Sequence, residues 1–350
     1  MTLNKVTIKT IAKKINVSPA TVSKALRDSH DISDQTKLKI KNLAKKLGYK
    51  PNLMARNLVS KKSNIIGVIV PDISTSFFGL TVRGINYAAR KHNYEVIILV
   101  NDEDHKVERK NIEFISNLQV DGILIDSVPG NHNLDLLEEL SENGMPIVFV
   151  DRKCKKINAD SVTTDDIKAG YTITKYFLKN NKSKIVFVGD VDLLTVANDR
   201  VKGYKKALKE FGIKFDKELL LKINYEIDEE QLKEKIRSFI HSKKEFDSFI
   251  CAGGVIAYLV GLVLLEEGFA IPDGVLLGEF GDNNIVYRLG VPFITVDQSP
   301  ISIGATAFDL LVTRMKDVRN TNAKRKQIYV KSKLVSHHPA KHEHLFIEHI

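Results

Sequence analysis

The spacing of apolar residues changes at residue 65, and this change limits the folds open to the chain. Before that point, Ile8, Ile11, Ala12 and Ile15 recur at the spacing of one helix face. After it, short runs of Val, Ile and Leu alternate with amphipathic stretches. Strands of this composition separated by helices are typical of parallel sheets covered on both faces. The sequence therefore predicts an α/β protein with a small helical N-terminal unit and a larger body.

The body contains two series of candidate strands, and each series predicts one doubly wound parallel-sheet lobe. The first series is Ile65–Val70, Val96–Val100, Gly122–Ile125 and Ile147–Val150. The second series is Ser161–Thr163, Ile185–Val188, Ser248–Cys251 and Val275–Leu277. Ligands of such sheets bind at the carboxyl ends of the strands, so two lobes predict a binding cleft between them.

Charge is concentrated in the same N-terminal unit. The chain has a net charge of +10, but residues 1–62 contain 15 Lys and Arg against 3 Asp and Glu, which is +12 and leaves −2 for the rest. A basic unit joined to a nearly neutral body indicates binding to a polyanion. A Lys-rich surface that is merely solvated is the alternative.

Three helices are predicted in the first fifty residues. The second begins after Ser18, a good N-cap, with Pro19 at its first position. The third follows Ser33 and ends at Gly48. Two short helices joined by about three residues, with a third behind them, follow the helix-turn-helix plan. A three-helix bundle without DNA-binding activity is the alternative.

The second helix of this plan lies in the major groove, with its N-terminal residues at the base edges. Val22, Ala25 and Leu26 point inward in the predicted helix, which leaves short or basic residues on its outer face. The expected DNA contacts of this head are Thr7, Ser18, Pro19, Ala20, Thr21, Ser23 and Lys24.

Three segments resemble the head of the LacI/GalR family of bacterial transcriptional regulators: Val6–Ala12, Val17–Leu26 and Leu47–Asn52. The resemblance continues through the body and covers nearly the whole chain. It implies a periplasmic-binding-protein-like body and a repressor whose affinity for operator DNA changes when a small molecule binds. Lys24 departs from the family, which usually has Arg there, and Lys cannot form the planar fork that Arg makes with guanine.

Residues 51–64 resemble the hinge helix of the family. The resemblance implies that this segment orders on operator DNA and that Leu58 enters the minor groove, where apolar side chains unstack base steps. Packing of Leu58 on the body is the alternative. Two hinges at a dyad imply a homodimer and a pseudo-palindromic operator. The expected DNA contacts of the hinge are Asn52, Ala55, Arg56 and Leu58.

We therefore predict a head at 1–50, a hinge and linker at 51–64, an effector-binding and dimerisation domain at 65–340, and a tail at 341–350. Within the body, about 65–157 and 292–320 form the predicted N-lobe, and about 158–291 and 321–340 form the C-lobe. The C-terminal segment is rich in His, but the His spacing matches no standard set of metal ligands. It predicts a flexible polar tail.

Polar and aromatic residues at predicted strand ends form the expected effector site. An aromatic ring can cover the apolar face of a sugar, and carboxylates and Arg pair with hydroxyls. The expected residues are Thr75, Phe77, Phe78, Asp102, Asp126, Asp151, Arg200, Tyr225, Asp282 and Gln298. These positions match those where the family holds its effector. Arg200 lies in a stretch, Arg200-Val-Lys-Gly-Tyr204, that resembles the family's Arg-x-x-Gly-Tyr. We expect a carbohydrate, with a purine or another small polar metabolite as alternatives.

Two departures from the family fall in the C-lobe part of this site. Gly253-Gly254 stands where the family usually has Asn-Asp, and this removes two hydrogen-bonding side chains. The stretch from Gly278 to Asp282 has one residue more than the family's Gly-Phe-Asp-Asp. Either Glu279 or Asp282 therefore replaces the usual acid.

Other classes of function are disfavoured. The sequence contains no phosphate-binding loop, no Gly-x-Ser-x-Gly elbow and no convincing nucleophile–base set, so we expect no catalytic residue, metal or cofactor. It has neither a signal peptide nor an apolar run long enough for a membrane span, which favours a cytoplasmic protein with Cys154 and Cys251 reduced. A sugar-binding transport-type protein and an enzyme with an appended DNA-binding head are the alternatives.

Overall fold

The computed structural model describes residues 6–49, 62–130, 132–152, 157, 159–192, 195–224, 227–242, 244–281, 283–316, 324–341 and 343–350. They belong to two compact units, a head (Met1–Ser63) and a body (Asn64–Ile350). The predicted hinge contacts Asn52, Ala55, Arg56 and Leu58 lie outside the described residues, as do Tyr225, Asp282 and Cys154. Among the described residues, no helix has the length and hydropathy of a membrane span.

The head consists of the three predicted helices, α1 (Ile8–Ile15), α2 (Pro19–Leu26) and α3 (Asp34–Lys46). Each begins at a hydroxyl side chain that accepts a hydrogen bond from the backbone N–H three residues on: Thr7, Ser18 and Ser33. The buried centre is small and apolar, and contains Ile11, Ala12, Val22, Ala25, Ile40 and Ala44. These positions confirm the predicted inward faces of the first two helices.

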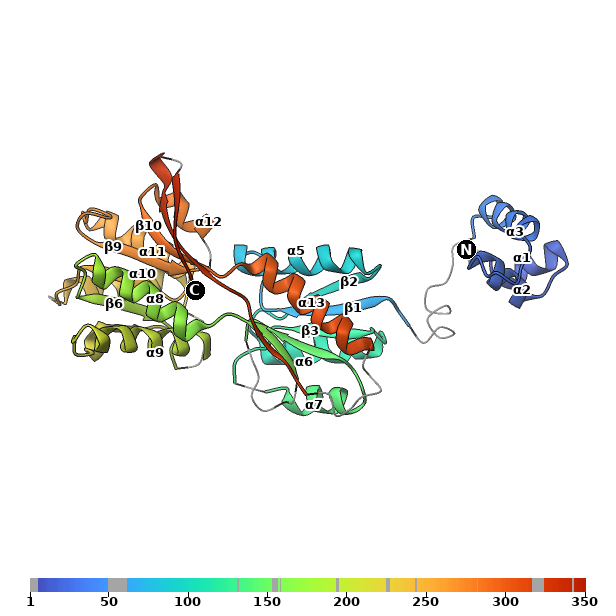
Figure 1. Ribbon diagram of the computed structural model, residues 1–350, viewed down its shortest axis with the longest axis horizontal. Helices are drawn as coiled ribbons and strands as arrows, with labels where there is room; N and C mark the ends of the chain where they lie inside the picture. Colours follow the sequence, from blue (N-terminus) through green and yellow to red (C-terminus); the bar gives the residue numbers. More distant parts are fainter. Residues whose placement is uncertain are drawn as a thin grey trace. The chain divides into compact units, whose positions relative to one another are not determined.

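The first sheet of the body is parallel, in the order β11-β5-β4-β3-β1-β2. Its strands are β1 (Ile65–Val70), β2 (Glu95–Val100), β3 (Gly122–Ile125), β4 (Ile147–Val150), β5 (Asp160–Thr163) and β11 (Gln327–Tyr329). One face is covered by α5 (Ser76–Lys91) and α13 (Pro300–Lys316), and the other by α6 (His105–Asn117) and α7 (Leu134–Glu142) (Figure 1).

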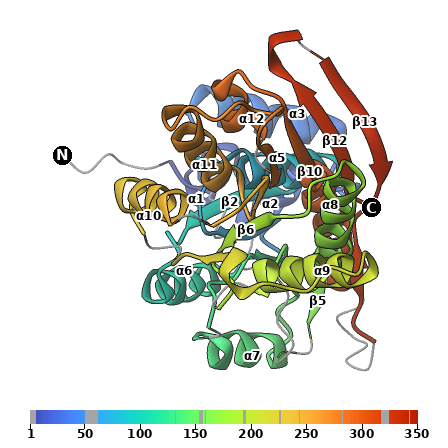
Figure 2. The ribbon, with the colours of Figure 1, turned by 90° about the vertical axis from the view of Figure 1, so that its left-hand side faces the viewer.

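The second sheet has the order β13-β12-β10-β9-β8-β6-β7. The strands β6 (Ile185–Gly189), β7 (Leu220–Lys222), β8 (Ser248–Cys251), β9 (Leu276–Phe280) and β10 (Phe293–Asp297) are parallel, whereas β12 (Lys333–His338) and β13 (Glu343–His349) add an antiparallel edge. The helices α8 (Asp166–Lys179) and α9 (Thr195–Glu210) cover one face. The helices α10 (Glu229–His241) and α11 (Gly254–Glu266) cover the other (Figure 2).

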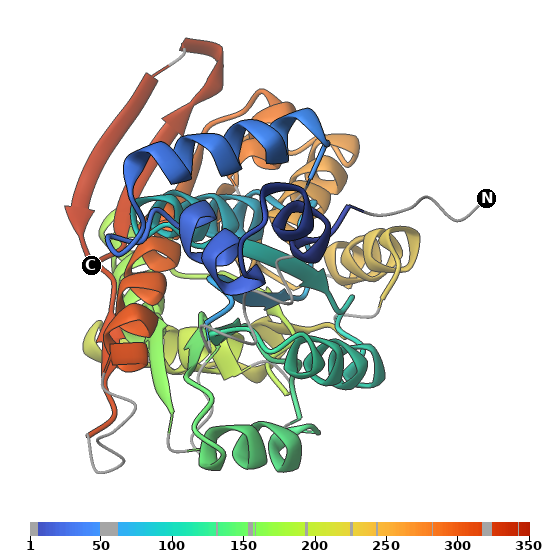
Figure 3. The same ribbon diagram turned by 90° about the vertical axis from the view of Figure 1, so that its right-hand side faces the viewer.

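Short segments complete the body. They are the helix α12 (Asn283–Val286) and the 3-10 helices η1 (Lys217–Leu219), η2 (Tyr287–Leu289) and η3 (Pro339–Lys341). The hairpin of β12 and β13 stands at the rim of the body when the molecule is viewed from two opposite sides (Figures 2 and 3).

The predicted lobe boundaries need correction. The strands β5 and β11 were expected in the C-lobe, but they pair with each other in the first sheet, where β5 also pairs with β4. The strand β10 was expected in the N-lobe but pairs with β9 and β12 in the second sheet. The chain therefore passes between the lobes after β5, after β10 and after β11. Apolar pattern identifies a strand but not its neighbours in a sheet, which is why the boundaries were misplaced.

The C-terminal segment also differs from the predicted flexible tail. Residues Glu343–His349 form β13, which pairs antiparallel with β12 along its length. The pairing is possible because η3 reverses the chain between the two strands. The mixed polar and apolar composition of β13 is typical of an edge strand whose two faces are both partly exposed to solvent.

Two pairs of helices approach each other closely enough to require glycine. A Cβ atom on Gly84 in α5 would overlap the backbone carbonyl of Ile301 in α13, and one on Gly304 would overlap that of Thr81. Gly170 and Gly203 have the same relation between α8 and α9. These contacts fix the position of each helix pair on its sheet, because rigid backbone atoms meet directly.

A Gly84→Ala variant should lose about 1–3 kcal/mol of unfolding free energy, because the added methyl group must push two backbones apart. Gly79→Ala, on the same helix, is the matched control. A Cβ there meets only the oxygen of Ile73, at 3.6 Å. Relief of glycine's unfavourable helix propensity should leave this control as stable as the parent or up to about 1 kcal/mol more stable. Urea denaturation measures both, and equal effects would contradict the close-packing account.

Candidate functional site

The predicted outer face of the recognition helix is present in the head. Val22 and Ala25 are buried in the core of the head. Of the seven residues predicted to contact DNA, Thr21 and Ser23 are half-buried and the others are exposed: Thr7, Ser18, Pro19, Ala20 and Lys24. The structure therefore offers a surface of short side chains and one long cation at the start of α2.

The start of α2 is stiffened by its own side chains. Ser18 Oγ accepts a hydrogen bond from the Thr21 backbone N–H at 3.0 Å, and the two hydroxyl oxygens lie 2.8 Å apart. Thr7 and Thr10 form a reciprocal capping box at the start of α1. The residues predicted to meet DNA therefore hold defined positions before any ligand binds.

Lys24 has an acidic partner within the head. Its ammonium lies 2.5 Å from Asp31 Oδ2. The hydrogen bond from Lys24 lowers the pKa of the Asp31 carboxyl to about 2. A second exposed pair, Lys41 with Asp28, lies 2.5 Å apart. Lys24 must exchange this carboxylate for a DNA acceptor if it reads the operator.

In the body, two predicted acids follow adjacent strands and are buried. Asp126 comes directly after β3 and is 1% exposed, and Asp151 comes directly after β4 and is 7% exposed. Neither oxygen of Asp126 has a hydrogen-bond partner, and neither does Oδ1 of Asp151. Buried polar atoms are almost always paired in proteins. Two such carboxylates at one sheet edge indicate that a ligand or water supplies the missing donors.

The charge on Asp126 is balanced only in part. Arg152 Nε lies 3.6 Å from Asp126 Oδ1, but its terminal nitrogens donate to Glu103 at 2.7 and 2.5 Å. Burial raises the pKa of Asp126 well above its ordinary value despite the attraction of Arg152, and neighbouring Asp151 raises it further. Burial also raises the pKa of Asp151, and the nearby Arg200 and Arg152 oppose that shift.

Arg200 projects from α9 of the second lobe to the same region. Its Nε donates to Asp166 Oδ1 at 2.8 Å and its Nη1 to the Ala252 carbonyl at 2.7 Å, while its guanidinium lies 4.4 Å from the centre of the Phe280 ring. Burial raises the pKa of Asp166 to about 6, although Arg200 pulls it down. Asp126 and Asp151 of the first lobe and Arg200 of the second thus belong to one electrostatic network.

A second group of predicted residues meets where the chain crosses between lobes. Gln298 follows β10, is buried, and donates from Nε2 to Thr164 Oγ1 at 3.2 Å. A Cβ on Gly281 would lie 2.7 Å from Gln298 Oε1 and 3.6 Å from the Phe77 ring. Asn284 Nδ2 donates to Ser76 Oγ at 2.9 Å, which joins the second lobe to the start of α5.

Other predicted residues lie outside these groups. Asp102 is exposed in a turn, and the preceding Asn101 is the buried residue at the end of β2. Thr75 is half-buried at the start of α5, and its N–H donates to Asp72 Oδ2 at 3.0 Å. Phe78 packs edge-on against Phe77 with ring centres 5.2 Å apart. The prediction for Asp102 thus selected the exposed one of two adjacent polar residues.

Sequence reasoning left out residues that hold the site together. Arg152 and Asp166 lie shortly after strand ends, but only the structure shows that Arg152 pairs with Glu103 and Asp166 with Arg200. The sequence signal that could have found them is the excess of acidic residues at predicted strand ends, because such residues need cationic partners when they are buried. Glu279, one of two alternatives for the C-lobe acid, is fully buried and accepts a hydrogen bond from Thr295, while Asp282 lies outside the described residues.

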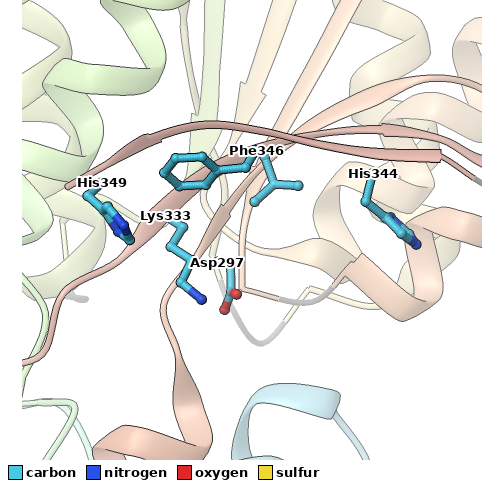
Figure 4. Close-up of a pocket in the computed structure, with 6 residues that line it drawn as sticks. Asp297, Lys333, His344, Phe346 and His349 are labelled. Atoms are coloured by element: carbon cyan, nitrogen blue, oxygen red, sulfur yellow. The ribbon is translucent and has the colours of Figure 1, made fainter.

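The described residues contain no cluster of three or more His, Cys, Asp or Glu side chains placed to hold a metal ion. Cys251 is buried as a free thiol, and burial raises its pKa. A cavity of about 410 Å³ opens elsewhere in the body, against β10, β12 and β13 (Figure 4). Its lining includes none of the predicted effector residues.

Comparison with known protein families divides the chain as the fold does. Residues 7–52 match the family of bacterial regulatory proteins described as the lacI family. Residues 63–336 match the family described as periplasmic binding proteins and sugar binding domain of the LacI family.

Two individual transcriptional regulators are similar to this chain over most of its length. The HTH-type transcriptional regulator RegA of Clostridium saccharobutylicum is 31% identical over 309 residues, which are 87% of this chain and 91% of that protein. DegA of Bacillus subtilis, also an HTH-type transcriptional regulator, is 27% identical and covers 85% of this chain and 87% of its own.

Two solved structures share the fold. The lac repressor dimer bound to operator and an anti-inducer has a TM-score of 0.80 and 18% identity, with 93% of this chain and 96% of that chain covered. The complex of the transcriptional regulator CelR with cellobiose has a TM-score of 0.69 and 19% identity, with 94% and 98% covered.

An Asp126→Asn variant should be more stable than the parent in the absence of ligand, by about 1 kcal/mol at a pH above the raised pKa of Asp126, because it removes a buried charge without hydrogen-bond partners. Folding raises the Asp126 pKa, so the folded parent binds more protons there than the unfolded chain. The parent therefore gains stability as pH falls through the raised pKa, whereas the variant does not.

The advantage of Asp126→Asn should consequently shrink as the pH is lowered from above the raised pKa of Asp126 toward the ordinary pKa of an aspartate. Denaturation of both proteins across this range measures it. The same substitution at the exposed acid Asp192 is the control for the chemical change itself. An advantage that grows toward acid pH would reverse the assigned direction of the pKa shift.

Proposed function

This chain belongs to the lacI family of bacterial regulatory proteins, and we propose that it is a cytoplasmic repressor controlled by a small polar ligand. The ligand binds between the two lobes of the body and changes the affinity of the heads for operator DNA. The observation that carries this proposal is the pair of buried, unsatisfied carboxylates of Asp126 and Asp151, placed in one network with Arg200.

The network favours a carbohydrate as the ligand. Asp126 and Asp151 can accept hydrogen bonds from vicinal hydroxyls, and those bonds would replace the missing donors. The half-buried rings of Phe77 and Phe78 lie at the start of α5 and can cover the apolar face of a sugar ring. CelR, which has the same fold, was solved with cellobiose. An anionic metabolite would instead meet two uncompensated acids.

The placement of the network suggests how binding reaches the DNA. Asp126 and Asp151 belong to the first lobe and Arg200 to the second, so a ligand that contacts both stabilises one relative position of the lobes. A ligand changes DNA affinity only if it binds the DNA-competent and incompetent forms unequally, and DNA then affects the ligand by the same factor. The proposal covers both an inducer and a corepressor.

On the DNA side, the proposal assigns Thr7, Ser18–Thr21, Ser23 and Lys24 to the operator surface. The exposed face of α2 and the charge of +12 in residues 1–62 support this assignment. We also propose that two chains bind a pseudo-palindromic operator through paired hinges at 51–64. An enzyme with a DNA-binding head is the competing proposal, and an assay for turnover of any bound ligand distinguishes the two.

A thermal-shift screen of sugars, sugar phosphates, uronic acids and nucleobases tests the effector. A neutral mono- or disaccharide should raise the melting temperature of the parent and change its operator affinity. Asp126→Asn should lose most of that shift while remaining folded, and Asp192→Asn should retain it. A ligand that stabilises Asp126→Asn and the parent equally would exclude Asp126 from the site.

Lys24→Ala should weaken operator binding by about tenfold, because one charge-assisted contact of the recognition helix is removed. If Lys24 contacts a phosphate, the slope of log affinity against log salt should also fall by about 1. Fluorescence anisotropy over a range of salt concentrations measures both. Lys222→Ala, a body lysine that pairs with Asp192, should change neither quantity. Unchanged affinity in Lys24→Ala would remove Lys24 from the operator surface.

A further inference from the structure

The 410 Å³ cavity lies on the outer part of the second sheet, against β10, β12 and β13. Its volume falls within the range of about 300–1,000 Å³ that is usual for pockets that bind small molecules. Val335 and Phe346 provide apolar surface, and Asp297, Lys333 and His349 provide polar groups. A few polar groups beside an apolar surface are the usual lining of a ligand site. The cavity therefore has the size and the composition of a small-molecule site.

A β-bulge in β13 brings two of its side chains onto the face of this cavity. On β12, Lys333 and Val335 are two residues apart and share one face of the sheet. Their partners on β13, His349 and Phe346, are three residues apart, because Ile347 is an extra residue in the register. Without the bulge, residues three apart would point to opposite faces. The rings of Phe346 and His349 instead lie together, with centres 4.8 Å apart. The bulge therefore places a polar ring beside the apolar wall of the cavity.

Two opposite charges lie at one end of the cavity. Asp297 and Lys333 are directly opposite each other on β10 and β12. Figure 4 shows both side chains, and that of His349, extending from the strands in the same direction. Within the described part of the chain, neither Lys333 nor Asp297 forms an ion pair. The Asp297 carboxylate accepts one hydrogen bond, from the Ser299 backbone N–H at 2.8 Å. The cavity thus presents an ammonium and a carboxylate side by side, and each can still bind a group of opposite charge.

The other end of the cavity is formed by a side chain that is already engaged. His344 lines the cavity, and its ring nitrogens contact the Tyr287 hydroxyl at 3.2 Å and His337 Nδ1 at 2.8 Å. The His337 ring in turn stacks on Phe293, with ring centres 4.7 Å apart. These contacts hold His344 in place as a wall. The polar groups left to bind a ligand are therefore the two opposite charges and the ring of His349.

We propose that this cavity binds an α-amino acid with a large apolar side chain. The carboxylate of the ligand accepts hydrogen bonds from Lys333 and His349, and its ammonium group donates to Asp297. The side chain of the ligand packs against Val335 and Phe346. A ligand with only one charge would leave one of the two charged groups of the cavity without a partner. The proposal goes beyond the proposed function, because none of the predicted effector residues lines this cavity.

Isothermal titration calorimetry and thermal shift of the full chain test the class of ligand. The probes are leucine, methionine and phenylalanine, each with the two analogues that lack either its ammonium or its carboxylate group. At least one of these amino acids should bind at millimolar concentration or below. Both of its analogues should bind about tenfold more weakly, because each loses a charge-assisted hydrogen bond.

Variants of the two charged residues assign the binding to this cavity. Lys333→Gln should weaken amino-acid binding about tenfold without weakening that of the analogue that lacks a carboxylate. Asp297→Asn keeps an acceptor for the Ser299 N–H. It should weaken amino-acid binding by a similar factor without weakening that of the analogue that lacks an ammonium group. Lys331→Gln changes an exposed lysine outside the cavity lining, and this matched control should bind as the parent does.

Several results would overturn the proposal. Neither heat nor a thermal shift with any of the amino acids at millimolar concentration would exclude this class of ligand. Equal binding by the parent, Lys333→Gln and Asp297→Asn would place the amino acid elsewhere. Binding that is lost in Asp126→Asn but retained in both cavity variants would assign the amino acid to the proposed effector site. A smaller assembly for Lys333→Gln than for the parent, in sedimentation without amino acid, would show that a second chain occupies the cavity.

Discussion

Charge buried at the ends of parallel strands is the constraint around which the body is organised. Glu103, Arg152, Asp126 and Asp151 of the first lobe adjoin Arg200 and Asp166 of the second. Each isolated charge would be costly to remove from water, so each needs a partner of opposite sign. The two Arg side chains supply part of that compensation, and each is held by other acceptors at the same time. Some of the carboxylate oxygens nevertheless lack hydrogen-bond donors.

This arrangement explains why the helices around it pack through glycine. Arg200 reaches Asp166 only if α8 and α9 stay in direct contact, and Gly170 and Gly203 allow that contact. Arg200 and Gly203 lie about one turn apart on α9, so they face the same side of the helix. Tyr204, the next residue, is buried and donates from its hydroxyl to the Ile185 carbonyl at 2.9 Å, which ties α9 to β6. The Arg-x-x-Gly-Tyr stretch thus combines one residue that we propose for the ligand site with two that fix the position of α9.

Local features of the fold could be predicted from sequence more fully than pairings between distant segments. The helix starts at Ser18 and Ser33 follow from side-chain capping, and apolar runs located most strands of the body. The sheet membership of β5 and β10 could not be read from these runs, because both are apolar in either sheet. For the site, a position directly after a strand was the ground for predicting Asp126, Asp151 and Gln298, and all three are buried there. Asp102 was predicted on the same ground but is exposed, because its neighbour Asn101 occupies the buried place at the end of β2.

The backbone conformation at Asp151 limits which residues can replace it. Its φ of 59° lies in the left-handed region, which Asn, Asp and Gly adopt far more readily than other residues. Replacement of Asp by Asn at this position keeps both the backbone path and the side-chain shape while it removes one negative charge. Replacement by a larger or β-branched residue strains the turn that follows β4. Evolution can therefore change the charge that this site accepts in a single step, whereas a change in its shape must begin at other positions.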